Sequence, residues 1–466
     1  MSNLQVYIDI FPARPNVWLY CRRTRKLIFD PYAVFTTRAT STASSSICQC
    51  DPMILIHTLR AFSRNTIKRQ RHPFNLPLAG WFHNGPSTLY RAGDGVGALQ
   101  SNLLPKLNYI LACQGITPET HTMGDSLHRY LAMKIHPLVD CSEWTNLVVV
   151  GQHSRVHDPE AVVSSKEKRD KLFNWMRPTA KHVGADLHIQ CFPGADHVKH
   201  YAALLATYLR ISRGNEAALK VFYEVVGNER TISTLESGTN ILQMPRVDVV
   251  VIGLVHRLGD LTSSSPFIGS RDDEFAWVVK RFGKSGKMVA FLGCRFSFWG
   301  SIGGDLVRVV AKHTGAKQLI YFGKLGTTRP SVQPNRYLAS GDSSWVPDAG
   351  VVQWKNILAP ALNAATKIPL VLGKHETLPS VLFETNEWLA KANARGHDFV
   401  DPEVGQMALA AVETGLEFGY LHVISDNVAQ KYDEDLSNER LKGVLHGRDQ
   451  LYKMVNQLLG KHLDSM

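Results

Sequence analysis

Apolar and amphipathic stretches alternate regularly along the second half of the chain. Two runs, residues 247–253 and 287–293, have the continuous hydrophobic character of strands that are covered on both faces. Residues 318–323 and 368–373 are further predicted strands. Stretches with helical spacing lie between and after them, at 305–316, 384–396, 404–416 and 437–463. Strands that alternate with helices predict an α/β fold, with a mixed β-sheet flanked by helices.

The last predicted strand ends abruptly in polar residues. Residues 420–427 read YLHVISDN, so an apolar run stops at Ser425, Asp426 and Asn427. In open α/β sheets, ligands bind beyond the carboxyl ends of strands. Asp426 and the glycine-containing loop predicted at 323–328 are therefore expected at a binding edge. The alternative is that Asp426 caps the segment that begins at Asn427.

The first half has a less regular pattern. Apolar runs at 147–151 and 188–194 and a helical stretch at 197–212 predict α/β or α+β structure, without indicating a function. A chain of 466 residues exceeds what one hydrophobic core usually serves. We therefore predict an N-terminal domain of unknown fold over residues 1–240 and a second domain over residues 245–466.

Composition narrows the class of protein. The chain is 44% hydrophobic and 20% charged, as expected for a globular protein. No apolar run reaches the roughly 18–20 residues of a membrane span, so we predict no membrane partner. The first residues lack the pattern of a secretory signal. The 7 cysteines are scattered, which favours a reducing, cytoplasmic location.

The net charge of +11 favours anionic partners. The densest basic stretch, RNTIKRQRH at 64–72, could contact nucleic acid, but no zinc-finger spacing or RNA-binding signature accompanies it, so a solvated surface is favoured. Two histidine pairs, His153 with His157 and His197 with His200, have the spacing of metal ligands. Because the chain has 19 histidines, chance pairs are expected, and we predict no metal site.

Four segments of the second half, in order, resemble the nucleoside phosphorylase superfamily, which includes purine nucleoside phosphorylases and methylthioadenosine and AMP nucleosidases. They are LIYFGKLGTT (319–328), NRYLASGDSSWV (335–346), VDPEVGQMALAA (400–411) and HVISD (422–426). The resemblance covers about residues 245–466. It implies cleavage of the N-glycosidic bond of a purine nucleoside or nucleotide, and a homo-oligomer.

The resemblance implies that Glu403 grips the ribose hydroxyls and that Asp426 protonates the leaving base. Such an acid must be partly buried so that its pKa rises. The further substrate-binding candidates are Ser425, Phe383, His375, Val381, Gly326 and Thr327. Glu403 could instead be an exposed acid at a helix N-terminus. Pro402 replaces the usual Met and suits the first position of that helix.

We favour inorganic phosphate as the nucleophile, and thus as a co-substrate. We predict no cofactor. Arg257 lies four residues after Gly253, which is the spacing of a phosphate-contacting Arg in many bacterial phosphorylases. Tyr321 and Phe322 stand where a second such Arg is usual. The remaining phosphate-binding candidates are Lys324, Thr328, Arg295 and Gly253, with Ser301 and a Gly303-Gly304 anion nest beside them. The alternatives are a hydrolytic nucleosidase and a lapsed nucleoside-binding protein.

Overall fold

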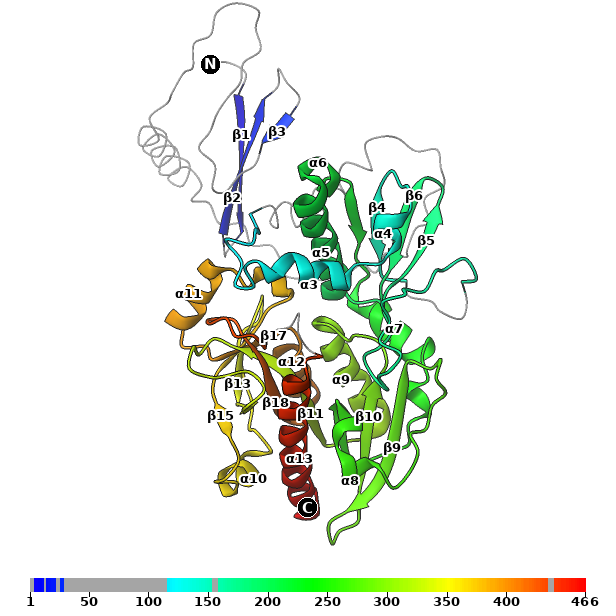
Figure 1. Cartoon of the computed structure of the whole chain (residues 1–466), viewed down its shortest axis with the longest axis vertical. Coiled ribbons are helices and arrows are strands. Elements are labelled where there is room, and N and C mark those ends of the chain that lie inside the picture. Colours follow the sequence, from blue (N-terminus) through cyan, green and yellow to red (C-terminus); the bar gives the residue numbers. More distant parts are fainter. Residues whose placement is uncertain (1–3, 12–13, 22–25, 29–114, 153–157, 435–439) are drawn as a thin grey trace, which may run out of the picture. The chain divides into compact units, whose positions relative to one another are not determined.

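The computed structural model describes residues 4–11, 14–21, 26–28, 115–152, 158–434 and 440–466 (Figure 1). The chain divides into two compact units, residues 1–89 and residues 90–466. In the first unit, β1 (Leu4–Phe11), β2 (Arg14–Cys21) and β3 (Lys26–Ile28) form an antiparallel sheet in that order. The basic stretch 64–72 and the pair His153 and His157 lie outside the described residues.

The second unit begins with a small α/β layer. Its elements are α3 (Ser126–Lys134), α4 (Leu138–Cys141), β4 (Leu147–Val150), β5 (Thr179–Val183), β6 (Asp186–Gln190), α5 (Ala195–Arg213), α6 (Asn215–Ala218), β7 (Val221–Glu224) and α7 (Asn228–Ser237). The strands form a four-stranded sheet in the order β5-β6-β4-β7. The long helix α5 buries Leu205 and Leu209 against this sheet, in one core with Leu147 and Ile189.

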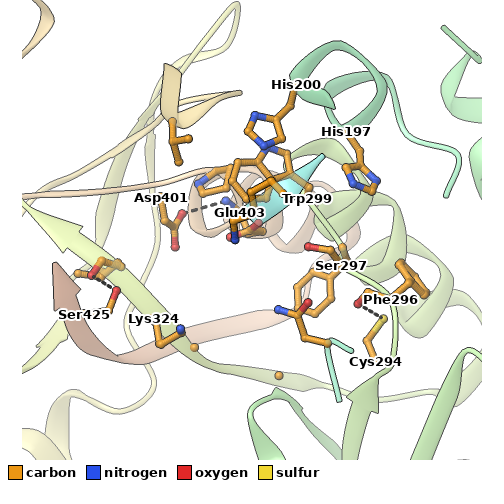
Figure 2. Close-up of a pocket in the computed structure, with 18 of the residues that line it drawn as sticks. His197, His200, Cys294, Phe296, Ser297, Trp299, Lys324, Asp401, Glu403 and Ser425 are labelled. Carbon is orange, nitrogen blue, oxygen red and sulfur yellow. Dashed lines mark hydrogen bonds between the residues drawn. The ribbon is translucent and has the colours of Figure 1, made fainter. Parts of the chain in front are cut away.

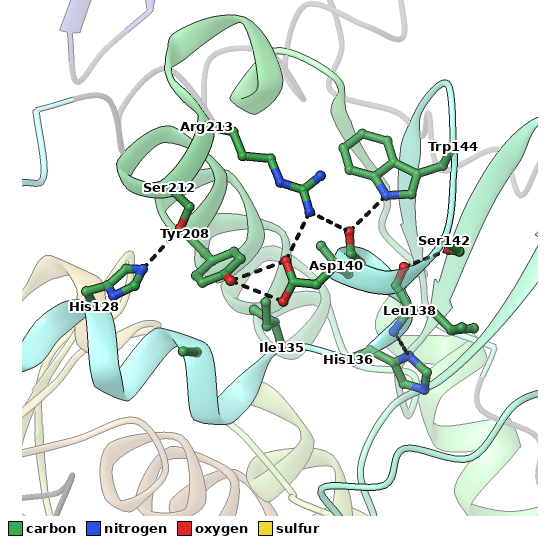
Figure 3. Close-up of polar contacts among 12 residues, drawn as sticks. His128, Ile135, His136, Leu138, Asp140, Ser142, Trp144, Tyr208, Ser212 and Arg213 are labelled. Carbon is green, nitrogen blue, oxygen red and sulfur yellow. Dashed lines mark hydrogen bonds and ion pairs between the residues drawn. The ribbon is translucent and has the colours of Figure 1, made fainter.

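Polar contacts attach the short helices to α5 (Figure 3). The hydroxyl of Tyr208 donates to both carboxylate oxygens of Asp140, at 3.2 and 3.1 Å. Arg213 donates to the same carboxylate at 3.1 Å and to the carbonyl of Val139 at 3.1 Å. Because α4 is only one turn long, these contacts and the apolar core orient it.

The remaining elements build the large sheet and its helices. They are the short 3₁₀ turn η1 (Ile241–Gln243), β8 (Val249–Gly253), η2 (Val255–Arg257), α8 (Gly259–Thr262), β9 (Phe275–Phe282), β10 (Lys287–Cys294), α9 (Ser301–Thr314), β11 (Gln318–Thr327), β12 (Leu338–Ser340), β13 (Ser343–Val346), β14 (Gly350–Gln353), α10 (Ala359–Ala364), β15 (Leu370–Leu372), β16 (His375–Thr377), η3 (Val381–Phe383), α11 (Asn386–Ala394), β17 (Phe399–Asp401), α12 (Val404–Thr414), β18 (Glu417–Asn427) and α13 (Lys442–Asp464).

The large sheet has 11 strands of mixed direction. Its centre is β11, which pairs in parallel with β8 and β18 and, near its end, antiparallel with β17. On one side, β8 continues to β10 and the antiparallel edge strand β9. This mixed sheet with flanking helices confirms the predicted α/β class.

Burial on both faces explains the continuous apolar runs of the central strands. In β8, Val250 and Ile252 pack in the core that contains α9 and α12, whereas Val249 and Val251 pack in the core that contains α13. Each strand residue thus faces one helical layer or the other. The packing of α9 on α12 is close, because a Cβ on Gly304 would lie 2.8 Å from the carbonyl oxygen of Gln406.

Several boundaries differ from the prediction. Helix α9 begins at Ser301 instead of residue 305, and β11 continues to Thr327, through the segment predicted as a loop. Asp426 lies inside β18 and does not cap the segment that follows. The side chain of Asn427 has that role, because its oxygen accepts from the amides of Ala429 and Gln430. Pro402 precedes the Glu403 N-cap of α12, so it is not the first helical residue. The domain boundary at 240–245 stays a prediction. Within the described ranges, no helix has the length and apolar character of a membrane span.

Asp305, on the buried side of α9, predicts a pH dependence of stability. Burial raises the pKa of its carboxyl to about 6, against roughly 3.9 in an unfolded chain. Because the folded state binds this proton more tightly, the contribution of Asp305 to stability falls as pH rises from about 4 to about 6.

At pH 7, the free energy of unfolding of Asp305→Asn is therefore expected to exceed that of wild type by about 2–3 kcal/mol. Near pH 4 the two values should be equal. Urea unfolding at both pH values measures this difference. Arg308 pairs with Asp305 at 3.0 Å and with Glu413 at 2.6 Å, so it keeps the second ion pair in the variant. An equal difference between variant and wild type at the two pH values would contradict the assignment.

Candidate active site

A cavity of about 260 Å³ lies at the carboxyl ends of β8, β10, β11 and β18. Figure 2 shows Lys324, Ser425, Asp401 and Glu403 on the side of the large sheet, and His197 and His200 on the side of α5. The cavity is lined by residues of the large sheet and by residues of the small α/β layer that lie between Tyr130 and Leu204 in the sequence. Its position agrees with the general rule that ligands bind at this edge of α/β sheets.

The ends of β11 and β18 bring Gly326 and Asp426 together. The two residues are paired in register, just after an irregularity between Leu325 and Gly326. The hydroxyl of Ser425 donates to the Asp426 carboxylate at 2.6 Å, which orients it. Asp426 is 9% exposed, so its carboxyl group faces the cavity from a largely dry position.

Glu403 enters the cavity at the N-terminus of α12. Its own side chain does not cap the helix; instead, the carboxylate of Asp401 accepts from the amides of Glu403 and Val404, at 2.9 and 2.8 Å. Burial and the neighbouring Asp401 charge raise the pKa of Glu403 well above its usual range. Glu403 also shares a hydrogen bond with the hydroxyl of Tyr321. It is therefore a buried acid, and the exposed position considered from sequence is wrong.

Asp401 is held between two buried histidines. Its oxygens lie 3.1 Å from Nε2 of His375 and 3.6 Å from Nε2 of His422. Burial alone would raise the pKa of Asp401. The pKa is lowered instead, because these imidazoles and the amides of α12 favour the charged form of the carboxylate. Ser344 fixes the other side of His375, with its hydroxyl 2.8 Å from Nδ1. Asp401 therefore positions Glu403 through the start of α12.

Glu384, which sequence reasoning missed, lies beside Asp426. Burial and the Asp426 charge raise the pKa of Glu384 well above its usual range. Both carboxyl groups and Tyr130 also line a second cavity of about 120 Å³. A neutral carboxyl group can donate and accept a hydrogen bond at once. In the sequence, only its place directly after Val381 and Phe383, two of the predicted substrate-binding residues, pointed to Glu384.

The small α/β layer closes the cavity from the other side. His200, on α5, shares a 2.7 Å hydrogen bond between Nδ1 and the hydroxyl of Ser380 and stacks on Trp299 with ring centroids 4.0 Å apart (Figure 2). Trp299 in turn donates to the carbonyl of Pro379 at 2.9 Å. These contacts join α5 to the loop after β10 and to the segment before η3.

The N-terminus of α9 is occupied by a side chain of the same chain. The amide of Ser301 donates to the carboxylate of Asp196, from the first turn of α5, at 2.9 Å. The anion nest predicted at Gly303-Gly304 thus faces a carboxylate that is already present. Both glycines lie in the first turn of α9 and make room for α12: a Cβ on Gly303 would be 3.1 Å from Cγ of Met407.

Seven of the predicted site residues line the cavity. They are Gly253, Lys324, Gly326, Val381, Glu403, Ser425 and Asp426. The roles assigned to them stay predictions.

The other predicted residues lie outside this lining. Arg257 is exposed and lies over the ring of Tyr452 at 5.7 Å. Arg295 donates to the carbonyls of Asp273, Phe275 and Gly269. The hydroxyl of Thr327 donates to the carbonyl of Asp398, and that of Thr328 donates to the carbonyl of His397. His375 contacts Asp401, which separates it from the cavity. Phe383 packs between two apolar clusters. Within the described residues, no group of three or more His, Cys, Asp or Glu side chains could hold a metal ion.

A substitution at Gly326 should alter the site although it changes no polar side chain. A Cβ there would lie 2.8 Å from Oδ2 of Asp426 and 3.2 Å from Cγ1 of Val400. Because strand backbone holds both residues, Gly326→Ala is expected to displace the carboxyl group and to lower any activity of this site by at least about tenfold, at nearly unchanged stability. Steady-state kinetics and thermal unfolding measure the two quantities. Gly415→Ala, at the end of α12, is the matched control: its Cβ meets nothing within 4 Å, but the φ of 72° strains it, so this variant should lose stability and leave the site unchanged.

No protein-family model matches the chain. A protein of the fungus Cordyceps militaris named Oxidoreductase cns1 is 24% identical over 260 residues, which are 52% of this chain and 33% of that protein. The chain thus spans about a third of the length of the curated relative it matches.

Solved structures with a similar fold cover about half of this chain. They include the 5′-methylthioadenosine/S-adenosyl homocysteine nucleosidase of Campylobacter jejuni, 15% identical, covering 47% of this chain and 100% of that one with a TM-score of 0.39. The purine nucleoside phosphorylase of Schistosoma mansoni is 14% identical and covers 51% of this chain and 96% of that one, with a TM-score of 0.39. At these identities the likeness concerns the fold alone.

Proposed function

We propose that the cavity cleaves the N-glycosidic bond of a purine nucleoside or nucleotide. The observation that carries this proposal is the pair of buried acids that line one cavity, Glu403 at the start of α12 and Asp426 near the end of β18. The reaction needs one group that anchors the ribose and another that neutralises the leaving base. The resemblance of the surrounding segments to nucleoside phosphorylases supports the same assignment.

In the proposed reaction, the bond between C1′ and the base nitrogen breaks and its electron pair moves into the base. Asp426, oriented by Ser425, takes up a proton when the substrate binds and donates it to the base, which leaves neutral; such general acid catalysis contributes roughly 10²–10⁴-fold. Glu403 hydrogen-bonds the ribose hydroxyls and anchors the sugar beside the bond that breaks. Glu384, beside Asp426, contacts the base edge.

The nucleophile that bonds to C1′ is inorganic phosphate or water. Lys324 supports phosphate, because it lines the cavity on the strand that also carries Gly326. Water is the alternative, because Arg257 and Arg295, the two arginines predicted to bind phosphate, lie outside the lining. The homo-oligomer and the cytoplasmic location stay predictions.

The test is incubation of the full chain with a panel of purine nucleosides and nucleotides, with and without inorganic phosphate, while chromatography follows the free base. Release that needs phosphate assigns a phosphorylase, and release without phosphate assigns a nucleosidase. Glu403→Gln is expected to raise KM strongly in either case. Tight nucleoside binding with no release from any substrate would contradict the proposal and favour a binding protein.

A further inference from the structure

Acidic and basic side chains line the cavity from different parts of the chain. The acidic groups Glu384, Asp401, Glu403 and Asp426 all belong to the large sheet and its connections. Five cationic side chains also line it, and four of them come from the small α/β layer: Lys134, Lys168, Lys171 and Arg177, with Lys324 on β11. All five are partly buried. We call the part lined by the four acidic groups the acidic end of the cavity and the part lined by the cations of the small α/β layer its basic end.

Backbone hydrogen bonds fix three of these cations next to the large sheet. The amides of Asn174, Trp175 and Met176 donate to the carbonyls of Cys294 and Arg295, each at 2.9 Å. This contact ties the loop 163–178 to the last residue of β10 and the residue after it. Trp175 and Met176 are buried in the main core. Lys168, Lys171 and Arg177 thus stand on an anchored loop at the carboxyl end of a central strand.

Positive side chains around the cavity affect the histidines beside it. Burial, followed by the charge of Arg177, lowers the pKa of His197 to about 4. Burial, His197 and the charge of Lys134 lower the pKa of His200. His256, just outside the lining, is affected in the same way, with its pKa lowered to about 3 by burial and by the charges of Arg257 and Lys171. These imidazoles are neutral at pH 7 and do not add to the positive charge.

We propose that Lys168, Lys171 and Arg177 bind a phosphate group carried by the substrate, so that the preferred substrate is a phosphorylated nucleoside. This inference rests on the proposed function. Glu403 and Asp426 would hold the sugar and the base at the acidic end. A phosphate on the sugar would then extend to the basic end, where ammonium and guanidinium groups donate charge-assisted hydrogen bonds to it. Partial burial strengthens this attraction relative to an exposed basic surface.

Two sources could supply the phosphate group, the substrate or free inorganic phosphate, and binding measurements separate them. Isothermal titration calorimetry compares adenosine, guanosine and inosine with their 5′-monophosphates and with inorganic phosphate alone. We expect a monophosphate to bind at least tenfold more tightly than its matched nucleoside. The Lys168→Ala/Lys171→Ala double variant is expected to lose this preference. The Lys168→Arg/Lys171→Arg variant is expected to keep it, because it keeps the charge.

Lys391→Ala is the matched control, since Lys391 is exposed on α11 and pairs only with Glu387 among the ion pairs of the described residues. Equal affinity for monophosphate and nucleoside in wild type would overturn the inference, and so would a preference that survives the double alanine variant. Binding of inorganic phosphate alone, without a preference for the monophosphate, would assign the cations to the co-substrate and also overturn it. Tight monophosphate binding without base release would leave the inference standing and refute the proposed function.

Discussion

Asp426→Asn is expected to reduce base release by roughly 10²–10⁴-fold while leaving substrate affinity within a few-fold of wild type. Asn keeps the shape of the side chain and can still accept the hydrogen bond that Ser425 donates at 2.6 Å. It cannot deliver a proton to the leaving base, so the loss should appear in kcat and not in KM. Single-turnover chromatography of the free base measures the rate of the chemical step directly.

Two controls separate chemistry from folding in this experiment. Asp449→Asn removes an exposed carboxylate of α13 and should leave both rate and stability unchanged. Thermal unfolding of Asp426→Asn should match wild type, since the substitution preserves volume. Full activity of Asp426→Asn would remove Asp426 from the reaction, and Glu384, the carboxyl group beside it, would become the candidate acid.

Asp401→Ala is expected to lower the free energy of unfolding by roughly 3–5 kcal/mol, as is typical when one member of a buried charged network is removed. The variant leaves the amides of Glu403 and Val404 without their acceptor. It also leaves the imidazoles of His375 and His422 without the carboxylate between them. Urea-induced loss of the circular dichroism of helices measures this change.

Asp401→Asn refines the test, because the amide oxygen can still accept from the α12 amides. Its loss of stability should be clearly smaller than that of the alanine variant. Glu387→Gln, which breaks an exposed pair on α11, should have no measurable effect. If Asp401→Ala were as stable as wild type, packing on α9 and the 3.0 Å hydrogen bond from the amide of Gly405 to the hydroxyl of Thr377 would be enough to hold the start of α12.

Elements with strong local signals could be predicted from the sequence. Strands β8, β10 and β18 are apolar on both faces, and α12 has regular helical spacing followed by Gly415 at its end. For the same reason, the polar strand end at Asp426 could be recognised. Strand β9 was missed because Lys280 and Arg281 interrupt its apolar pattern, which is a consequence of its position at the sheet edge.

The parts of the site that depend on contacts distant in sequence could not be predicted. The loop with Lys168 and Lys171 resembles any polar surface loop until its backbone bonds to Cys294 and Arg295 are known. Arg257 and Arg295 had suitable spacing, but their side chains are oriented by tertiary contacts that no local pattern encodes. Glu384 belongs to no recognisable motif. Its pKa is raised by burial and by the charge of Asp426, and neither can be read from the local sequence.

The carboxylate of Asp196 at the start of α9 has a consequence for how the protein reaches its native state. Asp196 and Ser301 are 105 positions apart along the chain. The first turn of α9, which supports α12 and hence Glu403, acquires its cap only when α5 has docked. Closing so long a connection is slow relative to forming a helix. The acidic end of the cavity should therefore mature late in folding, and a nascent chain would gain substrate affinity only in that last step.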